Sequence, residues 1–211
     1  GTNQIEVRVS KESANASVNR AERRGDYWTF GGIFRPVWTE ARPRHHITWT
    51  AIDARADGSF SAQVHFDEPM PRNTRIVAQI LDATGRPIGT PLTAPAGRKN
   101  AVTLAGKIEN AATWTAETPN LHTVKLVAQQ GSRKLYERTE RFGFRTLEVR
   151  PNDGVFLNGR KIVLKGVNRH SFRPATGRTL TREENYADAR LIKSMNMNAV
   201  RMSHYPPDPA F

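Results

Sequence analysis

Two polar clusters near the C-terminal end of the sequence hold the side chains best suited to chemistry. Each cluster directly follows a short apolar run, and together they comprise Asn168, Arg169, His170, Arg201 and His204. Asparagine, arginine and histidine offer directed hydrogen-bond donors and acceptors, which suit polyhydroxylated or anionic ligands. The residue types therefore predict a binding site for such a ligand, provided that the fold brings the two clusters together.

Two predicted strands and a helix must position these clusters. Residues 161–167 and 198–202 are short apolar runs, and Thr181 and Glu184 between them have the spacing of a helix capping box. Apolar residues then recur along one face of this helix. A strand–helix–strand unit pairs its strands in parallel with a right-handed crossover, so both clusters are expected at one edge, on strands about 4.8 Å apart.

A purely structural interpretation of the same residues stays open. Arg169 and Arg201 could fix loop carbonyl groups, and the two histidines could cap the strand ends. Spacing alone does not separate this interpretation from ligand binding. Because two strands and one helix cannot close a barrel or cover a sheet, residues 149–211 are expected to be one part of a larger α/β domain.

The preceding residues, 43–148, have the pattern of an all-β domain. Apolar and polar residues alternate in several runs, as between Phe60 and Phe66, and turn signals such as Asp57-Gly58 separate the runs. The predicted strands are residues 47–54, 59–66, 75–81, 100–104, 122–129 and 134–144. About seven short strands in about 100 residues, without a helix, are typical of an immunoglobulin-like β-sandwich, with Trp49 and Trp114 as candidate core side chains.

Residues 1–42 contain two further strand candidates, residues 5–9 and 33–39, on either side of the polar stretch 10–24. Two strands do not make a stable domain, so this segment is predicted to be the tail of a β domain whose earlier strands are missing. The fold class predicted for the chain is therefore mainly β, with an α/β portion at its C-terminal end.

Composition argues against several classes of function. The 211 residues carry a formal net charge of +12, but no basic helix, zinc-finger spacing or aromatic RNA-binding signature accompanies it. A solvated basic surface is therefore favoured over nucleic-acid binding. The sequence has no cysteine, which excludes disulfides and thiolate metal sites. It also has no run of about 18 apolar residues, so no membrane-spanning segment is expected.

Several segments of the sequence resemble glycoside hydrolase family 2, which includes β-galactosidases, β-glucuronidases and β-mannosidases. The segments are residues 26–37, 114–121, 141–145, 158–159, 165–170 and 198–206. Their order and spacing over nearly the whole chain make the likeness specific, whereas any one of them alone would be weak. The likeness is strongest to bacterial β-galactosidases, through residues 166–170 and 201–206, although Met202 replaces the small residue usual there.

The resemblance implies three parts. Residues 1–42 would be the C-terminal part of a jelly-roll sugar-binding domain, residues 43–148 an immunoglobulin-like β-sandwich, and residues 149–211 the N-terminal fragment of a (β/α)8 catalytic barrel, or TIM barrel. In such a barrel the carboxyl ends of the strands carry the active site, which agrees with the position of the two polar clusters.

The resemblance also implies roles for single residues. Asp26 is similar to an aspartate that reaches into the active site and holds sugar hydroxyls, in some members through a sodium ion. His204 matches a histidine that hydrogen-bonds the sugar in the subsite where cleavage occurs. The residues that match the rim of this subsite are Asn168, Arg169, His170 and Arg201.

The activity implied is that of a retaining, exo-acting β-glycosidase that hydrolyses non-reducing terminal sugars from a β-linked oligosaccharide or glycoside. Such enzymes use two carboxylates about 5–5.5 Å apart, one as general acid/base and one as nucleophile. In the family both are glutamates from later barrel strands. Here Glu183 and Glu184 lie at the helix start, away from the strand ends, and Asp208 has no partner carboxylate. We therefore expect no catalytic residue in this chain, no activity of the chain alone, and no cofactor beyond Na⁺ or Mg²⁺ in the full-length enzyme.

Two other functions remain as alternatives, namely a non-catalytic carbohydrate-binding or interaction module that keeps barrel sequence, and a basic nucleic-acid binder. The sequence does not determine which sugar is bound or whether the chain forms a homo-oligomer. It also leaves the compartment open between periplasmic or secreted use and the cytoplasm.

Overall fold

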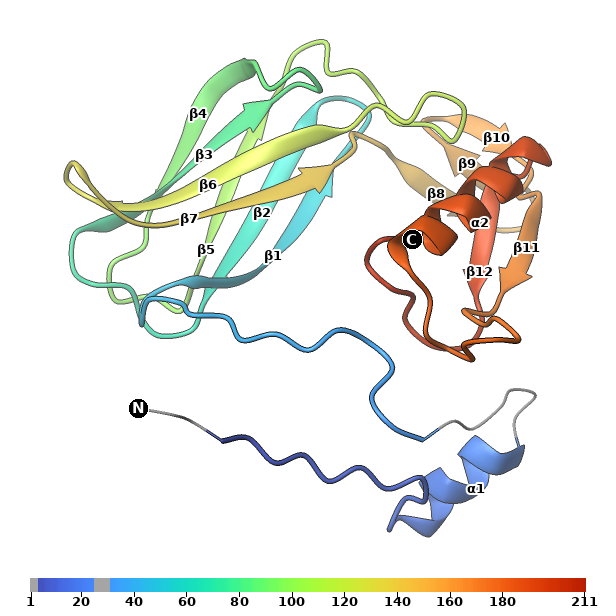
Figure 1. Cartoon of the computed structure of the whole chain (residues 1–211). Coiled ribbons are helices and arrows are strands. Elements are labelled where there is room, and N and C mark those ends of the chain that lie inside the picture. The colour runs from blue at the N-terminus through green and yellow to red at the C-terminus, as the bar shows by residue number, and fades with distance from the viewer. Residues whose placement is uncertain (1–3, 25–30) are drawn as a thin grey trace. The chain divides into compact units, whose positions relative to one another are not determined.

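The computed structural model describes residues 4–24 and 31–211 and divides the chain into two compact units (Figure 1). One unit, here called the sandwich unit, is Glu40–Val163. The other, here called the α/β unit, comprises Gly1–Thr39 and Leu164–Phe211. Each unit is described by itself below.

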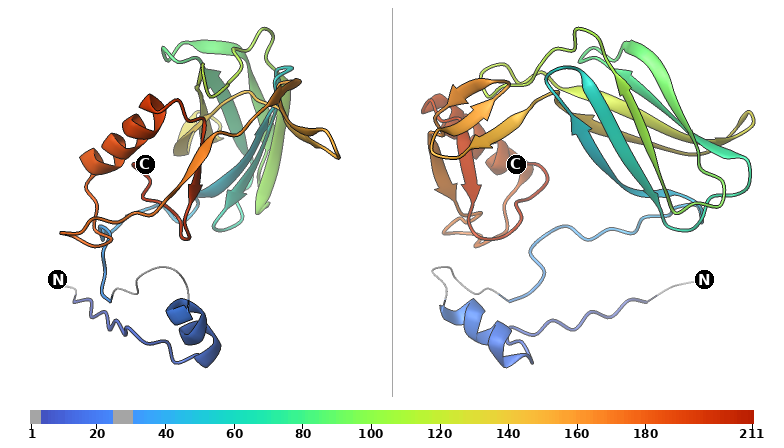
Figure 2. Two further views of the ribbon diagram at one scale, coloured as in Figure 1. Left: turned by 90° about the vertical axis from the view of Figure 1, so that its right-hand side faces the viewer. Right: turned by 180° about the vertical axis from the view of Figure 1, so that it is seen from behind.

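The sandwich unit contains two antiparallel sheets that face each other (Figures 1 and 2). The three-stranded sheet has the order β1-β2-β5, and the four-stranded sheet has the order β4-β3-β6-β7. The strands are β1 (Ile47–Ala54), β2 (Ser59–Phe66), β3 (Thr74–Leu81), β4 (Pro87–Pro95), β5 (Ala101–Lys107), β6 (His122–Gln130) and β7 (Arg133–Phe142). Strands β1 and β7 are the edge strands on the same side of the sandwich, where the two sheets approach each other.

The core of the sandwich unit lies between the two sheets and follows the alternation of the sequence. In β2, Phe60 and Val64 are buried, and in the opposite sheet Ile76 and Leu126 are buried against them. Because successive side chains of a strand point to opposite faces, one face of each strand enters this core and the other meets solvent. Gly58 fits the turn between β1 and β2 because its φ is +83° and an added Cβ would lie 2.1 Å from the carbonyl oxygen of Ile108.

A small third sheet follows in the same unit. It has the order β10-β9-β8 and consists of β8 (Leu147–Arg150), β9 (Gly154–Leu157) and β10 (Arg160–Ile162). Asn158 adopts a left-handed conformation between β9 and β10, with φ of 51°. Its side-chain oxygen accepts from the Thr146 N–H at 2.9 Å, and its Nδ2 donates to the carbonyl oxygen of Trp114 at 3.0 Å. One side chain therefore fastens this hairpin to the sandwich.

The α/β unit contains the predicted strand–helix–strand arrangement. Strand β11 (Gly166–Arg169) pairs in parallel with β12 (Ala199–Met202), and helix α2 (Arg182–Ser194) connects them and lies alongside the pair (Figure 2). Thr181 is the N-cap of α2, and its side chain and that of Glu184 complete the predicted capping box. A second helix, α1 (Ala16–Arg24), begins after Asn15, whose side-chain oxygen accepts from the N–H groups of Ser17 and Val18.

Several sequence predictions about these elements are wrong. Residues 5–9 and 33–39 lie within the described ranges but form no strand, and Ile5 is 80% exposed. A strand needs a neighbouring strand to hydrogen-bond its backbone groups, and the alternation of the sequence does not supply one. The polar stretch 10–24, for which no helix or strand was predicted, contains α1. The predicted strand 161–167 is divided between β10, which pairs antiparallel with β9, and β11.

Two more differences concern the sandwich unit. Strand β4 was not predicted, because Pro87, Pro91 and Pro95 argue against the interior of a strand. In the structure β4 is an edge strand of its sheet, where proline is tolerated. Trp49 is not a core side chain, since it is 50% exposed and stacks on His65 of the neighbouring strand, with ring centroids 3.8 Å apart. Among the described helices, none is both long and apolar enough to span a bilayer.

Candidate functional site

The carboxyl ends of β11 and β12 bring the two predicted polar clusters together. The parallel register places Asn168 opposite Arg201 and Arg169 opposite Met202. The Ser203 N–H donates to the Arg169 carbonyl oxygen at 3.0 Å. Backbone hydrogen bonding between the two segments therefore continues one residue beyond the end of β12. The expectation that both clusters share one edge of a parallel pair is therefore confirmed for these two strands.

Arg201 is the centre of the exposed part of this edge. Its Nη1 donates to the Ser203 hydroxyl at 3.1 Å and lies 3.5 Å from the Asn168 side-chain oxygen, and its Nη2 lies 3.3 Å from Nδ1 of His204. A guanidinium group only donates hydrogen bonds, so Nδ1 of His204 must accept. The neutral His204 ring then carries its proton on Nε2.

The two histidines lie edge to face. The ring centroids of His170 and His204 are 5.3 Å apart, with an interplanar angle of 79°, and the Tyr205 ring lies 6.5 Å from that of His170. Ser203 is buried, whereas His204 is exposed, and the peptide bond between them is cis. Asn168, His170, Arg201 and His204 therefore form one cluster of directed polar groups, here called the rim cluster.

Arg169 is placed differently from the other predicted rim residues. It is 7% exposed, and its guanidinium donates to the Asp188 carboxylate at 2.7 and 2.9 Å and to the Asn185 side-chain oxygen at 2.9 Å. The same group donates to the Ser171 hydroxyl at 3.0 Å and lies 3.9 Å from the centroid of the Phe211 ring. These contacts favour the structural alternative for Arg169, in which it fixes the loop after β11 against α2.

Asp188 is the acceptor on which this arrangement depends. Burial alone would raise the pKa of the Asp188 carboxyl, but hydrogen bonds from Arg173 and Arg169 outweigh burial and lower this pKa below its ordinary value. Arg173 Nη2 donates to the other carboxylate oxygen at 2.5 Å. The carboxylate therefore joins β11, the loop after it and α2 as a charged, fully hydrogen-bonded group.

Sequence reasoning did not find Asp188 or Arg173. Asp188 follows Asn185 by three residues, so both lie on the same side of α2, and Asn185 is completely buried. The spacing of Asn185 and Asp188 places two polar residues on the side of α2 that faces the strands. This spacing could have indicated that hydrogen bonds join the helix to the strands.

The segment before Glu40 contributes a second contact of the α/β unit that sequence reasoning missed. The Arg178 guanidinium lies 4.3 Å from the centroid of the Tyr205 ring and 5.7 Å from that of Phe34. Arg35 donates a hydrogen bond to the carbonyl oxygen of Pro206. Residues 34 and 35 therefore hold the loop that directly follows His204.

Asp26, the predicted sugar-binding and sodium-binding residue, lies outside the described residues. Among the residues that the structure does describe, no group of three or more His, Asp or Glu side chains is arranged to hold a metal ion. The Asp208 carboxylate accepts from the Ala210 N–H at 2.8 Å, and Glu184 accepts from the Thr181 N–H at 2.7 Å. Both carboxylates accept hydrogen bonds from backbone N–H groups. Within the described ranges, the rim cluster offers hydrogen bonds to a ligand but contains no pair of carboxylates for acid–base chemistry.

Two family models match the chain. The model described as "Glycosyl hydrolases family 2" matches residues 43–145, and the model described as "Glycosyl hydrolases family 2, TIM barrel domain" matches residues 147–211. Together they cover the sandwich strands β1–β7 and all strands that follow them. The family resemblance of the sequence is thereby confirmed.

Individual proteins agree with the family models. The chain is 32% identical to a β-galactosidase of Halalkalibacterium halodurans over 98% of this chain and 20% of the relative, and 34% identical to one of Lactobacillus delbrueckii subsp. bulgaricus over 86% and 18%. The crystal structure of Bacteroides uniformis β-glucuronidase has a TM-score of 0.74 and 27% identity, over 88% of this chain and 24% of that chain. The chain spans about a fifth of the length of these two β-galactosidases. It belongs to glycoside hydrolase family 2.

Proposed function

We propose that the chain is part of a retaining, exo-acting β-glycosidase of the β-galactosidase type, which hydrolyses O-glycosidic bonds of non-reducing terminal sugars. Family membership and the names of the relatives support the reaction class. The observation that carries the proposal is the rim cluster, in which Asn168 and His204 both lie within hydrogen-bonding reach of Arg201 at adjacent strand ends.

The parts of the longer enzyme are proposed to follow the sequence division. Residues 1–42 belong to the end of a jelly-roll sugar-binding domain, residues 43–148 to an immunoglobulin-like sandwich, and residues 149–211 to the start of a TIM barrel. Two facing antiparallel sheets in the second part and a parallel strand–helix–strand unit in the third support this division.

The rim cluster is proposed to bind the sugar before cleavage. The His204 side chain contacts the sugar, as in the family that the sequence resembles, while Arg201 fixes its ring by donating to Nδ1. Asn168 and His170 offer further donors and acceptors beside it. Arg169 acts through its contacts with Asp188 and holds the strand end in place. Asp26 is proposed to reach the same sugar, directly or through a sodium ion.

The chemical step needs groups beyond this cluster. A retaining glycosidase requires an acid/base carboxyl and a nucleophilic carboxylate about 5–5.5 Å apart. Glu184 is part of the α2 capping box, and Glu183 lies in the first turn of the same helix. We infer that both catalytic glutamates belong to the rest of the enzyme and that this chain binds sugar without cleaving it.

Activity and binding are tested separately with the purified chain. With nitrophenyl β-galactoside, we expect release of nitrophenol at the rate of the buffer alone; release above that rate would contradict the assignment of the catalytic groups. Addition of galactose is expected to shift the NMR signals of His204, Asn168 and Arg201, because the sugar hydroxyls exchange hydrogen bonds with these groups. Shifts of Asn168 and Arg201 that are unchanged in a His204→Ala variant would show that the rim cluster is not the sugar site.

A further inference from the structure

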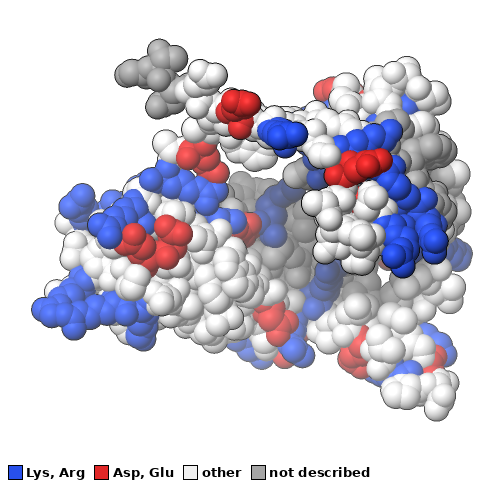
Figure 3. Space-filling view, turned by 90° about the horizontal axis from the view of Figure 1, so that it is seen from below, with Lys and Arg blue, Asp and Glu red and all other residues white. Residues whose placement is uncertain are grey.

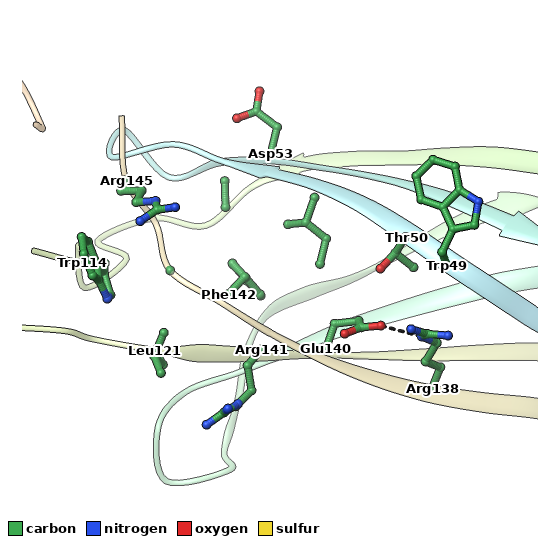
Figure 4. Close-up of a pocket in the computed structure, with 13 residues that line it drawn as sticks. Trp49, Thr50, Asp53, Trp114, Leu121, Arg138, Glu140, Arg141, Phe142 and Arg145 are labelled. Carbon is green, nitrogen blue, oxygen red and sulfur yellow. Dashed lines mark hydrogen bonds and ion pairs between the residues drawn. The ribbon is translucent and has the colours of Figure 1, made fainter. Parts of the chain in front are cut away.

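A groove on the sandwich unit is not explained by the proposed hydrolytic function. It lies between the edge strands β1 and β7, has a volume of about 650 Å³, and lies entirely within one unit (Figure 4). Cavities of this size are typical of small-molecule sites. Its lining is rich in arginine and includes two tryptophans, Trp49 and Trp114.

The charged groups of the groove fall into two classes. Arg138 is already paired, because it donates to the Glu140 carboxylate at 2.5 Å and to the Thr48 carbonyl oxygen at 2.7 Å. Asp53 is likewise paired with Arg55 at 3.0 Å. Arg141 and Arg145 are exposed, and within residues 4–24 and 31–211 neither has an ion pair or a side-chain hydrogen bond. The uncompensated charge of the groove is therefore that of two guanidinium groups.

Aromatic and apolar surfaces lie beside these two arginines. The Arg145 guanidinium lies 4.9 Å from the centroid of the Trp114 ring, and Leu121, which is 39% exposed, lines the same end of the groove (Figure 4). Gly143 permits this arrangement, since an added Cβ would lie 2.7 Å from Cβ of Trp114. At the other end, the stacking of Trp49 on His65 fixes an indole that remains 50% exposed.

We propose that this groove binds an anionic glycan, that is, a short oligosaccharide that carries carboxylate or sulfate groups. Arg141 and Arg145 bind the anionic groups, because planar guanidinium groups match carboxylate and sulfate oxygens with paired hydrogen bonds. Trp114 and Trp49 contact sugar ring faces, since an exposed indole offers a rigid apolar surface with a polar edge.

One feature of the groove favours a glycan over an acidic peptide, and the distribution of charge argues against unspecific attraction of anions. The two unpaired arginines are interrupted by apolar surface from Phe142 and Leu121, which suits a ligand that alternates charged groups with ring faces. A general attraction of anions to the basic chain would require no groove, and on the face shown in Figure 3 Lys and Arg stand in separate groups beside Asp and Glu, not in one stripe.

The experiment is titration calorimetry with the whole chain. The probes are trigalacturonate and a sulfated galactose disaccharide, compared with neutral galactotriose and tetraglutamate. We expect binding of at least one anionic glycan, and at least tenfold weaker binding by an Arg141→Gln/Arg145→Gln double variant. The matched control is Arg72→Gln/Arg75→Gln, which removes two exposed charges of the same unit away from the groove and should change the affinity less than twofold.

The outcomes separate the explanations. Equal losses in the two double variants would show that the overall charge attracts the ligand and would overturn the proposal. Tetraglutamate binding as tight as that of the glycans would identify the groove as a site for acidic protein segments, and failure of both glycans to bind would exclude the site. Each result is independent of hydrolysis, because the groove variants leave the rim cluster unchanged.

Discussion

At the scale of single residues, the two arginines of the predicted sugar site differ in what surrounds their guanidinium groups. Arg201 is exposed and contacts Asn168, Ser203 and His204, whereas Arg169 is buried against α2. The sequence placed both at strand ends and could not separate them. Neighbouring residues of a strand point to opposite faces, and only the structure shows which face of β11 the helix covers.

The proton position on His204 is the first testable consequence at this scale. Because Arg201 can only donate to Nδ1, we expect the neutral ring to be protonated on Nε2, as read from the ring nitrogen chemical shifts. Arg201→Met should move the equilibrium toward a mixture of both tautomers. Arg182→Met, which removes an exposed arginine of α2, should leave it unchanged. A dominant Nδ1-protonated ring in the unaltered chain would contradict the contact.

Asp188 predicts how the α/β unit responds to acid. Its pKa is lower in the folded chain than the ordinary value of 3.8, so its stabilising effect is complete above that value and is lost as the pH falls through the folded pKa. Asp188→Asn should lower the free energy of unfolding by roughly 3 kcal/mol at neutral pH, because Arg169 remains buried without a counter-charge. It should also flatten the acid limb of the stability curve.

Urea unfolding of this unit at several pH values, followed by NMR, measures this effect. Glu183→Gln is the matched control, since it removes an exposed carboxylate from the first turn of α2 and should change the stability little. An acid limb that is as steep in the Asp188→Asn variant as in the unaltered chain would show that another group causes it.

At the scale of elements, the predicted strands agree best with the structure where the alternation of the sequence matches the burial of the strand in the core. Strands β2 and β6 alternate strictly, and their buried faces form the sandwich core. Strand prediction failed where a neighbouring strand, and not the local sequence, decides whether a segment forms a strand. Among residues 4–24 and 31–211, the alternating segment 5–9 has no strand beside it. The proline-rich β4 pairs with β3, and residues 161–167 pass from one sheet into another.

The capping box at the N-terminus of α2 can be tested by mutation. Thr181→Ala removes the acceptor for the Glu184 N–H and should cost about 1 kcal/mol of helix stability. We expect faster amide hydrogen exchange in the first turn of α2. Thr179→Ala, which alters an exposed threonine two residues earlier, should have no such effect, and equal exchange rates in the two variants would exclude the capping role.

At the scale of the whole molecule, the two units differ in what they bury. All buried apolar side chains among residues 4–24 and 31–211 belong to the sandwich unit, whereas the buried side chains of the α/β unit are Arg169, Ser171, Asn185 and Ser203. Composition and periodicity indicated one β core and a separate α/β part. They could not show that the latter is held by hydrogen bonds, because those contacts join residues far apart in the sequence.

Native-state hydrogen exchange is expected to show this difference. Amides of β2 and β6 should exchange only on global unfolding of the sandwich unit, because both strands contribute to its apolar core. Amides of β11 and β12 should exchange faster, since the pair has no buried apolar layer within the described residues. Protection of β11 equal to that of β6 in a monomer would contradict this view.

The polar burial around Arg169 has a thermodynamic consequence for the α/β unit. Exposure of apolar surface raises the heat capacity on unfolding and exposure of polar surface lowers it, so a unit whose buried side chains are polar should unfold with a small change in heat capacity. Its stability curve is then shallow over temperature. Temperature would therefore distinguish the two units less by the midpoint of their transitions than by the curvature of the stability curve of each one.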